Sequence, residues 1–156
     1  MIGFAGLSHL GIVYSLATAS RGLEVLGFDP DAALCRELGE GRFPVSEPGL
    51  EGLFHSHHRQ IQFSADPASL RRCDLVFYSL DVPTDDSNRS NLEPLRELIE
   101  RTVLHVAPTA TAVILSQVPP GFTRSLKISL AGRGGRELFY QVETLVFGNA
   151  VQRALQ

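Results

Sequence analysis

The chain has 156 residues, of which 44% are hydrophobic and 20% are charged. This length and composition predict one soluble globular domain with an ordinary core, and they argue against a disordered chain. Fourteen basic and seventeen acidic residues leave a formal net charge of −3. Because no block of Lys and Arg supplies the footprint that nucleic acid or an anionic membrane requires, we expect neither as a partner.

Cysteine usage and the N-terminus indicate the compartment. Cys35 and Cys73 form no Cys-x-x-Cys pair, and we expect both to be buried thiols rather than a disulfide scaffold. The apolar stretch 1–20 carries no basic residue ahead of its apolar run, unlike a secretory signal. No stretch of about eighteen apolar residues offers a membrane span. These features predict a cytoplasmic protein.

Short apolar runs alternate with amphipathic ones along the chain. We predict strands at 2–5, 24–28, 61–63, 73–80, 111–115 and 137–140, and helices at 10–21, 31–39, 92–106 and 121–130. A further short helix opens at 46–50 with Pro48 in its first turn, and 132–135 form a turn or flexible break. This alternation predicts one α/β domain over residues 1–156, a doubly wound, Rossmann-type, mostly parallel sheet of about six strands.

The first chemical motif lies between the first predicted strand and the first predicted helix. Residues 6–11 read Gly-Leu-Ser-His-Leu-Gly, where a dinucleotide fold has G-x-G-x-x-G. Gly6 allows the tight turn, and Gly11 lets helix and strand pack closely. Ser8 replaces the second glycine, so its side chain narrows the approach of a pyrophosphate but offers it a hydroxyl. Glycine-rich turns also serve packing alone, which is the alternative interpretation.

Asp29 ends the second predicted strand, twenty-three residues after Gly6. A carboxylate at this place accepts hydrogen bonds from an adenosine ribose and repels the additional 2′-phosphate of NADP. The turn and Asp29 together predict NAD as the cofactor.

Three further segments occur in a specific order. They are Gly-Arg-Phe-Pro-Val-Ser-Glu-Pro-Gly-Leu at 41–50, the strand and loop 74–84 with Val-Pro-Thr at its end, and Ser-Gln-Val-Pro-Pro-Gly at 116–121. Together they resemble the N-terminal, NAD-binding domain of the UDP-glucose/GDP-mannose 6-dehydrogenase family, over residues 1 to about 151. In that family a Glu-Pro-Gly-Leu segment follows the second strand's helix, Thr-Pro ends the fourth strand, and Ser-Thr-Val-Pro-x-Gly ends the fifth.

The resemblance implies oxidation of a nucleotide sugar's C6 alcohol to a carboxylate, with two NAD⁺ and a thiohemiacetal on a cysteine. Such activity implies polysaccharide biosynthesis. The partners implied are NAD(H) and, only with a second domain, the nucleotide sugar. Family members commonly dimerise through elements beyond this segment, which leaves a homodimer open. The implied cofactor-binding residues are Gly6, Ser8, His9, Leu10, Gly11, Asp29, Ser79, Leu80, Val82, Pro83, Ser116 and Gln117.

Several positions depart from the family pattern. Val82 and Gln117 each replace a threonine, and Glu143 matches the first of two family glutamates. The second glutamate, implicated in acid/base work, is replaced by Phe147, which cannot transfer a proton. The chain ends before the family's catalytic cysteine and sugar-binding domain, and neither of its own cysteines lies at the nucleophile position. We therefore expect no catalysis by this chain alone.

Two other functions stay open at this point. One is a degenerate, non-catalytic Rossmann module with a regulatory or interaction role, which the replaced residues favour. The other is a small-hydroxyacid dehydrogenase with a related cofactor domain. We expect no metal site, because His-Ser-His-His at 55–58 fits no zinc signature. His9 either contacts the pyrophosphate or faces solvent beside the cleft, and 85–88 is expected to be a polar loop at the cleft's rim.

Overall fold

The computed structural model describes residues 1–87, 89–131 and 137–156, so the predicted turn at 132–135 lies outside the described residues. Within them, six parallel strands form one sheet in the order β3-β2-β1-β4-β5-β6. The strands are β1 Ile2–Ala5, β2 Val25–Phe28, β3 Ile61–Ser64, β4 Leu75–Tyr78, β5 Thr111–Ile114 and β6 Leu138–Tyr140. The predicted doubly wound fold is confirmed.

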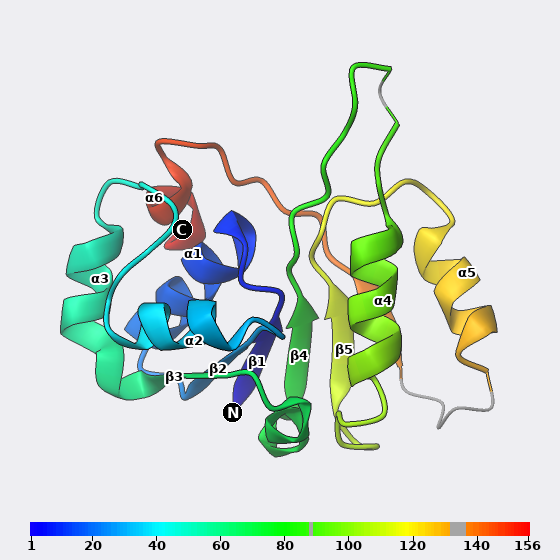
Figure 1. Cartoon of the computed structure of the whole chain (residues 1–156), viewed down its shortest axis with the longest axis horizontal. Coiled ribbons are helices and arrows are strands. Elements are labelled where there is room, and N and C mark those ends of the chain that lie inside the picture. Colours follow the sequence, from blue (N-terminus) through cyan, green and yellow to red (C-terminus); the bar gives the residue numbers. More distant parts are fainter. Residues whose placement is uncertain (88, 132–136) are drawn as a thin grey trace.

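The chain winds outward from β1 to β3 and then returns past β1 to begin β4 on the other side (Figure 1). Ala5 at the end of β1 pairs in register with Phe28 of β2 and with Tyr78 of β4. The direction of winding therefore reverses between β1 and β4. In open α/β sheets, ligands bind beyond the carboxyl ends of the strands at such a switch point.

Helices cover both faces of the sheet. They are α1 His9–Ser20, α2 Ala32–Gly39, α3 Leu50–His57, α4 Glu93–Thr102, α5 Phe122–Ser129 and α6 Ala150–Ala154, with short 3-10 segments η1 His58–Gln60 and η2 Pro67–Arg72. None of the helices in the described part of the chain is long and apolar enough to cross a membrane. The two 3-10 segments and α6 were not predicted from the sequence.

Helix α4 is shorter than the predicted helix 92–106. The Thr102 hydroxyl donates to the Leu98 carbonyl at 2.6 Å, and the Thr102 carbonyl accepts from the His105 N–H at 2.8 Å, so the chain turns out of the helix here. This turn carries Val106 into the core. The apolar periodicity continues past Thr102 because Val106 is buried without being helical.

Helix α3 begins later than predicted. Gly49, its N-cap residue, has a φ of 86°, in the left-handed region that interrupts helical geometry. Pro48 therefore precedes the cap and does not occupy the first turn, so that prediction is wrong.

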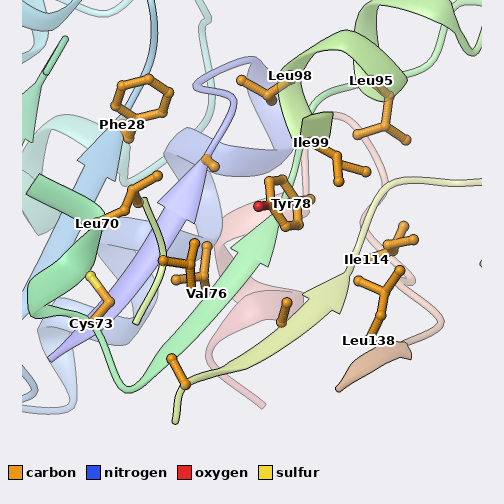
Figure 2. Close-up of a cluster of buried hydrophobic side chains, with 14 of the residues drawn as sticks. Phe28, Leu70, Cys73, Val76, Tyr78, Leu95, Leu98, Ile99, Ile114 and Leu138 are labelled. Atoms are coloured by element: carbon orange, nitrogen blue, oxygen red, sulfur yellow. The ribbon is translucent and has the colours of Figure 1, made fainter. Parts of the chain in front are cut away.

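Alternation along the strands divides the core into two clusters. Phe4 of β1 belongs to a cluster with side chains of α1, α2, α3 and α6, whereas its neighbour Ala5 belongs to a cluster with side chains of α4 and α5. Figure 2 shows the second cluster, in which Tyr78 of β4 lies beside Ile99 of α4 and Val76 lies toward Leu70 and Cys73. Each cluster holds one thiol, Cys35 in the first and Cys73 in the second, so the prediction of two buried cysteines is confirmed. Burial raises the pKa of Cys73 to about 11.

Main-chain hydrogen bonds join the segments that follow β1, β2 and β4. The Gly6 N–H donates to the Phe28 carbonyl at 2.9 Å, and the Ser79 N–H donates to the Ala5 carbonyl at 2.9 Å. After β4 the chain forms a loop that stands well out from the sheet (Figure 1). In this loop the Asn91 N–H donates to the Pro83 carbonyl at 2.9 Å. The switch point is thus bounded by a tight turn on one side and this projecting loop on the other.

Candidate cofactor site

The turn between β1 and α1 depends on its two glycines. Gly6 has a φ of 95°, and a Cβ atom there would lie 2.9 Å from the Leu80 backbone nitrogen. A Cβ on Gly11 would lie 2.0 Å from the Gly6 carbonyl oxygen. The buried hydroxyl of Ser79, which follows β4, donates a hydrogen bond to the Gly6 carbonyl at 3.0 Å. The turn is therefore fixed in shape, with α1 starting directly against it.

Helix α1 points its N-terminus into the switch point. Its first internal bond runs from the Ile12 N–H to the Ser8 carbonyl at 3.0 Å, so the N–H groups of residues 9–11 precede the helical hydrogen bonding. These groups and the positive end of the helix dipole suit an anion such as a pyrophosphate. The Ser8 hydroxyl turns the other way: it donates to the Ser79 carbonyl at 3.3 Å and accepts from the Asp81 N–H at 2.7 Å.

Asp29 lies on the other side of the turn and is 9% exposed. Its Oδ2 accepts from the Leu7 N–H at 2.9 Å, and its Oδ1 accepts from the Asp31 N–H at 3.0 Å. A carboxylate oxygen can accept two hydrogen bonds, so each Asp29 oxygen can accept one more, from a ribose hydroxyl, beside its backbone donor. The two backbone donors fix the carboxylate in place before any ligand arrives.

A pocket of about 350 Å³ opens beside Asp29. Its walls come from the ends of β2 and β3, the start of η2, the end of β4 and one side of α4; the lining residues are Phe28, Asp29, Pro30, Ala65, Pro67, Leu80, Pro94, Glu97, Leu98, Arg101 and Thr102. Most of these residues are apolar, and the charged ones are Asp29, Glu97 and Arg101. Such a pocket suits a flat aromatic base with a ribose attached.

A second pocket of about 270 Å³ lies at the α1 N-terminus. It is lined by His9, Leu10, Asp81, Val82, Gln117, Glu143, Leu145 and Phe147. The Gln117 amide donates to the Glu143 carboxylate, whose other oxygen accepts from the Leu145 N–H at 2.8 Å. The structure therefore places the three positions that depart from the expected pattern, Val82, Gln117 and Phe147, in one pocket with Glu143.

His9 is buried and connects the turn to two distant segments. Its Nε2 lies 2.8 Å from Glu47 Oε1, and its ring stacks on Phe147 with ring centroids 4.1 Å apart. The interpretation that His9 faces solvent is therefore wrong, because Glu47 and Phe147 enclose it. Contact with a pyrophosphate stays a prediction.

Glu47 holds the C-terminal segment against α1. Besides His9, its carboxylate accepts from the N–H groups of Gly148 at 2.8 Å and Ala150 at 3.3 Å. Burial would raise the pKa of Glu47, but the hydrogen bonds from Gly148, His9 and Ala150 outweigh burial and hold the pKa below its usual value. The sequence motif 41–50 contained this residue, but nothing in it indicated which distant groups the carboxylate would bind.

Comparison with known proteins identifies the family. The family model for the UDP-glucose/GDP-mannose dehydrogenase family, NAD binding domain, matches residues 1–151. The chain belongs to this family. NAD is accordingly the cofactor of this domain, and the glycine turn, the fixed Asp29 and the adjoining pocket are a set of residues that fits it. The family match also removes the small-hydroxyacid dehydrogenase from consideration.

Relatives of this NAD binding domain are longer proteins. The chain is 26% identical over 155 residues to UDP-glucose 6-dehydrogenase of Rickettsia bellii, covering 97% of this chain and 36% of the relative. It is 25% identical over 135 residues to GDP-mannose 6-dehydrogenase of Pseudomonas putida, covering 83% and 31%. The chain thus spans about a third of the length of these two curated relatives.

Solved structures share the fold of this NAD binding domain. The structure of a UDP-D-ManNAc dehydrogenase from Pyrococcus horikoshii matches with a TM-score of 0.85 at 22% identity, covering 97% of this chain and 38% of that one. A GDP-mannose dehydrogenase from Pseudomonas aeruginosa, solved as a ternary complex, matches with a TM-score of 0.83 at 21% identity, with the same coverage.

The predicted cofactor residues of this domain divide into groups. Leu80 lines the pocket beside Asp29, whereas His9, Leu10, Val82 and Gln117 line the second pocket. Ser79 and Ser116 are fully buried. The Ser79 hydroxyl donates to the Gly6 carbonyl at 3.0 Å and the Ser116 hydroxyl to the Tyr78 carbonyl at 3.2 Å, so both serines stabilise the backbone that surrounds the site. Pro83 lies in a separate recess of the projecting loop.

Two site residues were missed by the sequence analysis, Glu47 and Asp81. The only signal for Asp81 was its place directly after a buried strand, where a parallel sheet presents its ligand edge.

The described residues include no cluster of three His, Cys, Asp or Glu side chains able to hold a metal ion. His55 and His58, at the end of α3, direct their Nδ1 atoms to the carbonyls of Glu51 and His55 instead.

Proposed function

We propose that this chain is the NAD(H)-holding part of a nucleotide-sugar 6-dehydrogenase, whose sugar site and catalytic cysteine belong to a second domain. The observation that carries this proposal is the pair of pockets on either side of one glycine turn at the switch point, with the fixed carboxylate of Asp29 in one of them. When bound, NAD⁺ accepts a hydride from the C6 position of the sugar.

In this proposal each region of the site has one task. Asp29 accepts hydrogen bonds from the adenosine ribose, and the apolar pocket beside it takes the adenine ring. The N–H groups at the start of α1 hold the pyrophosphate. The pocket with Gln117 and Glu143 then receives the nicotinamide side, which follows from its position at the other end of the turn.

We expect no catalysis by the domain alone, because neither pocket contains a thiol nucleophile. Hydride transfer from an alcohol needs a group to take the hydroxyl proton, and the later acyl step needs a thiol nucleophile. Phe147 supplies neither group. His9, Asp81 and Glu143 in the same pocket are able to accept a proton, but the two thiols lie in the core clusters rather than in either pocket. We place the activity in cytoplasmic polysaccharide biosynthesis, with dimerisation through elements outside this domain.

A non-catalytic module with a regulatory or interaction role is the second candidate. The contacts of the replaced residues favour it, because Gln117 is bonded to Glu143 and Phe147 stacks on His9. A module of this kind would keep the fold and its pockets without a need for turnover.

Two assays on the purified chain test the proposal together. We expect NADH fluorescence to rise saturably on binding and NAD⁺ to compete with it. We also expect no absorbance change at 340 nm with NAD⁺ and UDP-glucose or GDP-mannose. Failure of folded protein to bind NADH would overturn the proposal in favour of the second candidate. Sugar-dependent NAD⁺ reduction by these 156 residues would show that the argument from the missing thiol is wrong.

A further inference from the structure

A carboxylate of the chain itself lies at the start of α1. The Leu10 N–H, in the first turn of that helix, donates to Asp81 Oδ2 at 3.4 Å. Asp81 belongs to the loop after β4 and lines the second pocket together with His9 and Glu143. The place at which a pyrophosphate would meet the helix dipole is thus already faced by a negative charge.

Ser8 accounts for the position of this carboxylate. Its hydroxyl accepts from the Asp81 N–H at 2.7 Å and donates to the Ser79 carbonyl at 3.3 Å. A glycine at position 8 has no atom for either bond. Ser8 therefore fixes the backbone of Asp81, and from this backbone the Asp81 carboxylate reaches the N-terminus of α1. The two residues act as a pair.

We propose that Asp81 is a specificity-determining residue that competes with the ligand diphosphate for the α1 N-terminus. The inference rests on the proposed function, in which this turn holds the pyrophosphate of NAD. Asp81 is exposed, so its side chain can rotate into solvent when a ligand arrives, but its charge stays near the diphosphate. The pair of Ser8 and Asp81 thus lowers affinity for diphosphate ligands and leaves the nucleoside part of the site unaffected.

The expected change in the affinity for a diphosphate ligand follows from Coulomb's law. A unit charge a few ångströms from a diphosphate, with solvent close by, changes the binding constant about three- to tenfold. The effect shrinks as salt screens the interaction. A purely structural role of Asp81 would show neither the preference for diphosphate ligands nor the salt dependence.

The experiment compares Asp81→Asn with the wild-type chain and with Asp86→Asn, which makes the same charge change on the projecting loop. Dissociation constants for NAD⁺, ADP and adenosine are measured by equilibrium dialysis at low and high salt. We expect Asp81→Asn to bind NAD⁺ and ADP about three- to tenfold more tightly at low salt, with a smaller gain at high salt. Adenosine affinity and all constants of Asp86→Asn should stay at wild-type values.

The outcomes separate this inference from the proposed function. If the wild-type chain binds NAD⁺ and Asp81→Asn binds it no more tightly, the inference is wrong and the proposed function stands. A gain that is equal for adenosine also overturns the inference. If neither protein binds NAD⁺ or ADP, the proposed function fails and takes the inference with it.

The variant Ser8→Gly tests independently whether Ser8 and Asp81 act as a pair. Removal of the hydroxyl should release residue 81 from the turn, so that Asp81→Asn gains less in the Ser8→Gly background than in the wild type. Equal gains in both backgrounds would show that the two residues do not act as a pair.

Discussion

Asp29 shows how much a single residue of this site could be predicted. Its place at the end of a strand, together with the glycine turn before it, indicated a ribose contact from sequence alone. The structure adds that the carboxylate is fixed by the N–H groups of Leu7 and Asp31. Asp81 and Glu47 could not be predicted in the same way, because their contacts join segments far apart in the chain.

Replacement of Asp29 should alter the choice of cofactor. Asp29→Asn keeps one acceptor oxygen, enough for either the Leu7 N–H or the Asp31 N–H, and removes the charge that receives the ribose hydroxyls. A hydrogen bond to a charged group contributes about 1.5–3 kcal/mol, so we expect NAD⁺ to bind about tenfold or more weakly. NADP⁺ should bind as well as before or better, because the 2′-phosphate no longer meets a carboxylate.

Competition against NADH fluorescence gives both constants, and Asp31→Asn serves as the control. Asp31 lies two residues further on, where its side chain caps α2 by accepting from the Ala33 and Leu34 N–H groups. The amide oxygen of Asn preserves this cap while removing the charge. Unchanged affinities for NAD⁺ and NADP⁺ in Asp29→Asn would rule out the ribose assignment.

At the scale of elements, most strands and helices could be predicted because apolar periodicity marks the faces that the core covers. Their ends could not always be predicted. The chain leaves α4 at Thr102 through local hydrogen bonds, although buried side chains continue beyond it. Helix α6 was missed because it has five residues, too few to show a period. It is held in place by Glu47, which is remote in sequence.

The C-terminal segment should depend on the Glu47 carboxylate. Glu47→Gln keeps the shape of the side chain but removes the charge that three hydrogen bonds share, one from His9 and two from backbone N–H groups. We expect the free energy of unfolding at pH 7 to fall by about 1–3 kcal/mol. Urea unfolding followed by circular dichroism measures this change, and Glu51→Gln on the exposed side of α3 is the control.

The same pair of proteins should differ in pH dependence. The folded pKa of Glu47 lies below its unfolded value, so the carboxylate stabilises the fold above about pH 4.3, and this stabilisation is lost as the pH falls through the folded pKa. The stability gap between wild type and Glu47→Gln should therefore be full at pH 7 and close in acid. A gap no larger than that of Glu51→Gln, or one that is constant with pH, would contradict this account.

At the scale of the whole molecule, the doubly wound sheet follows from the sequence because parallel strands leave few topologies once crossovers are right-handed. The sheet brings the loops after β1, β2 and β4 together, and with them the glycine turn, Asp29 and Asp81. The sequence pattern predicted the sheet, the glycine turn and Asp29, but not the contacts among these loops. The two pockets that flank the turn are the property of the folded chain on which the functional account depends.

The most direct test of the central claim is a calorimetric titration of the folded chain with NAD⁺ and, separately, with NADP⁺. We predict saturable one-site binding of NAD⁺ and markedly weaker binding of NADP⁺, because Asp29 accepts the ribose hydroxyls and repels a phosphate in their place. No binding heat from either nucleotide at several temperatures, in a sample shown to be folded, would contradict the account. Equal binding of both would contradict the role given to Asp29.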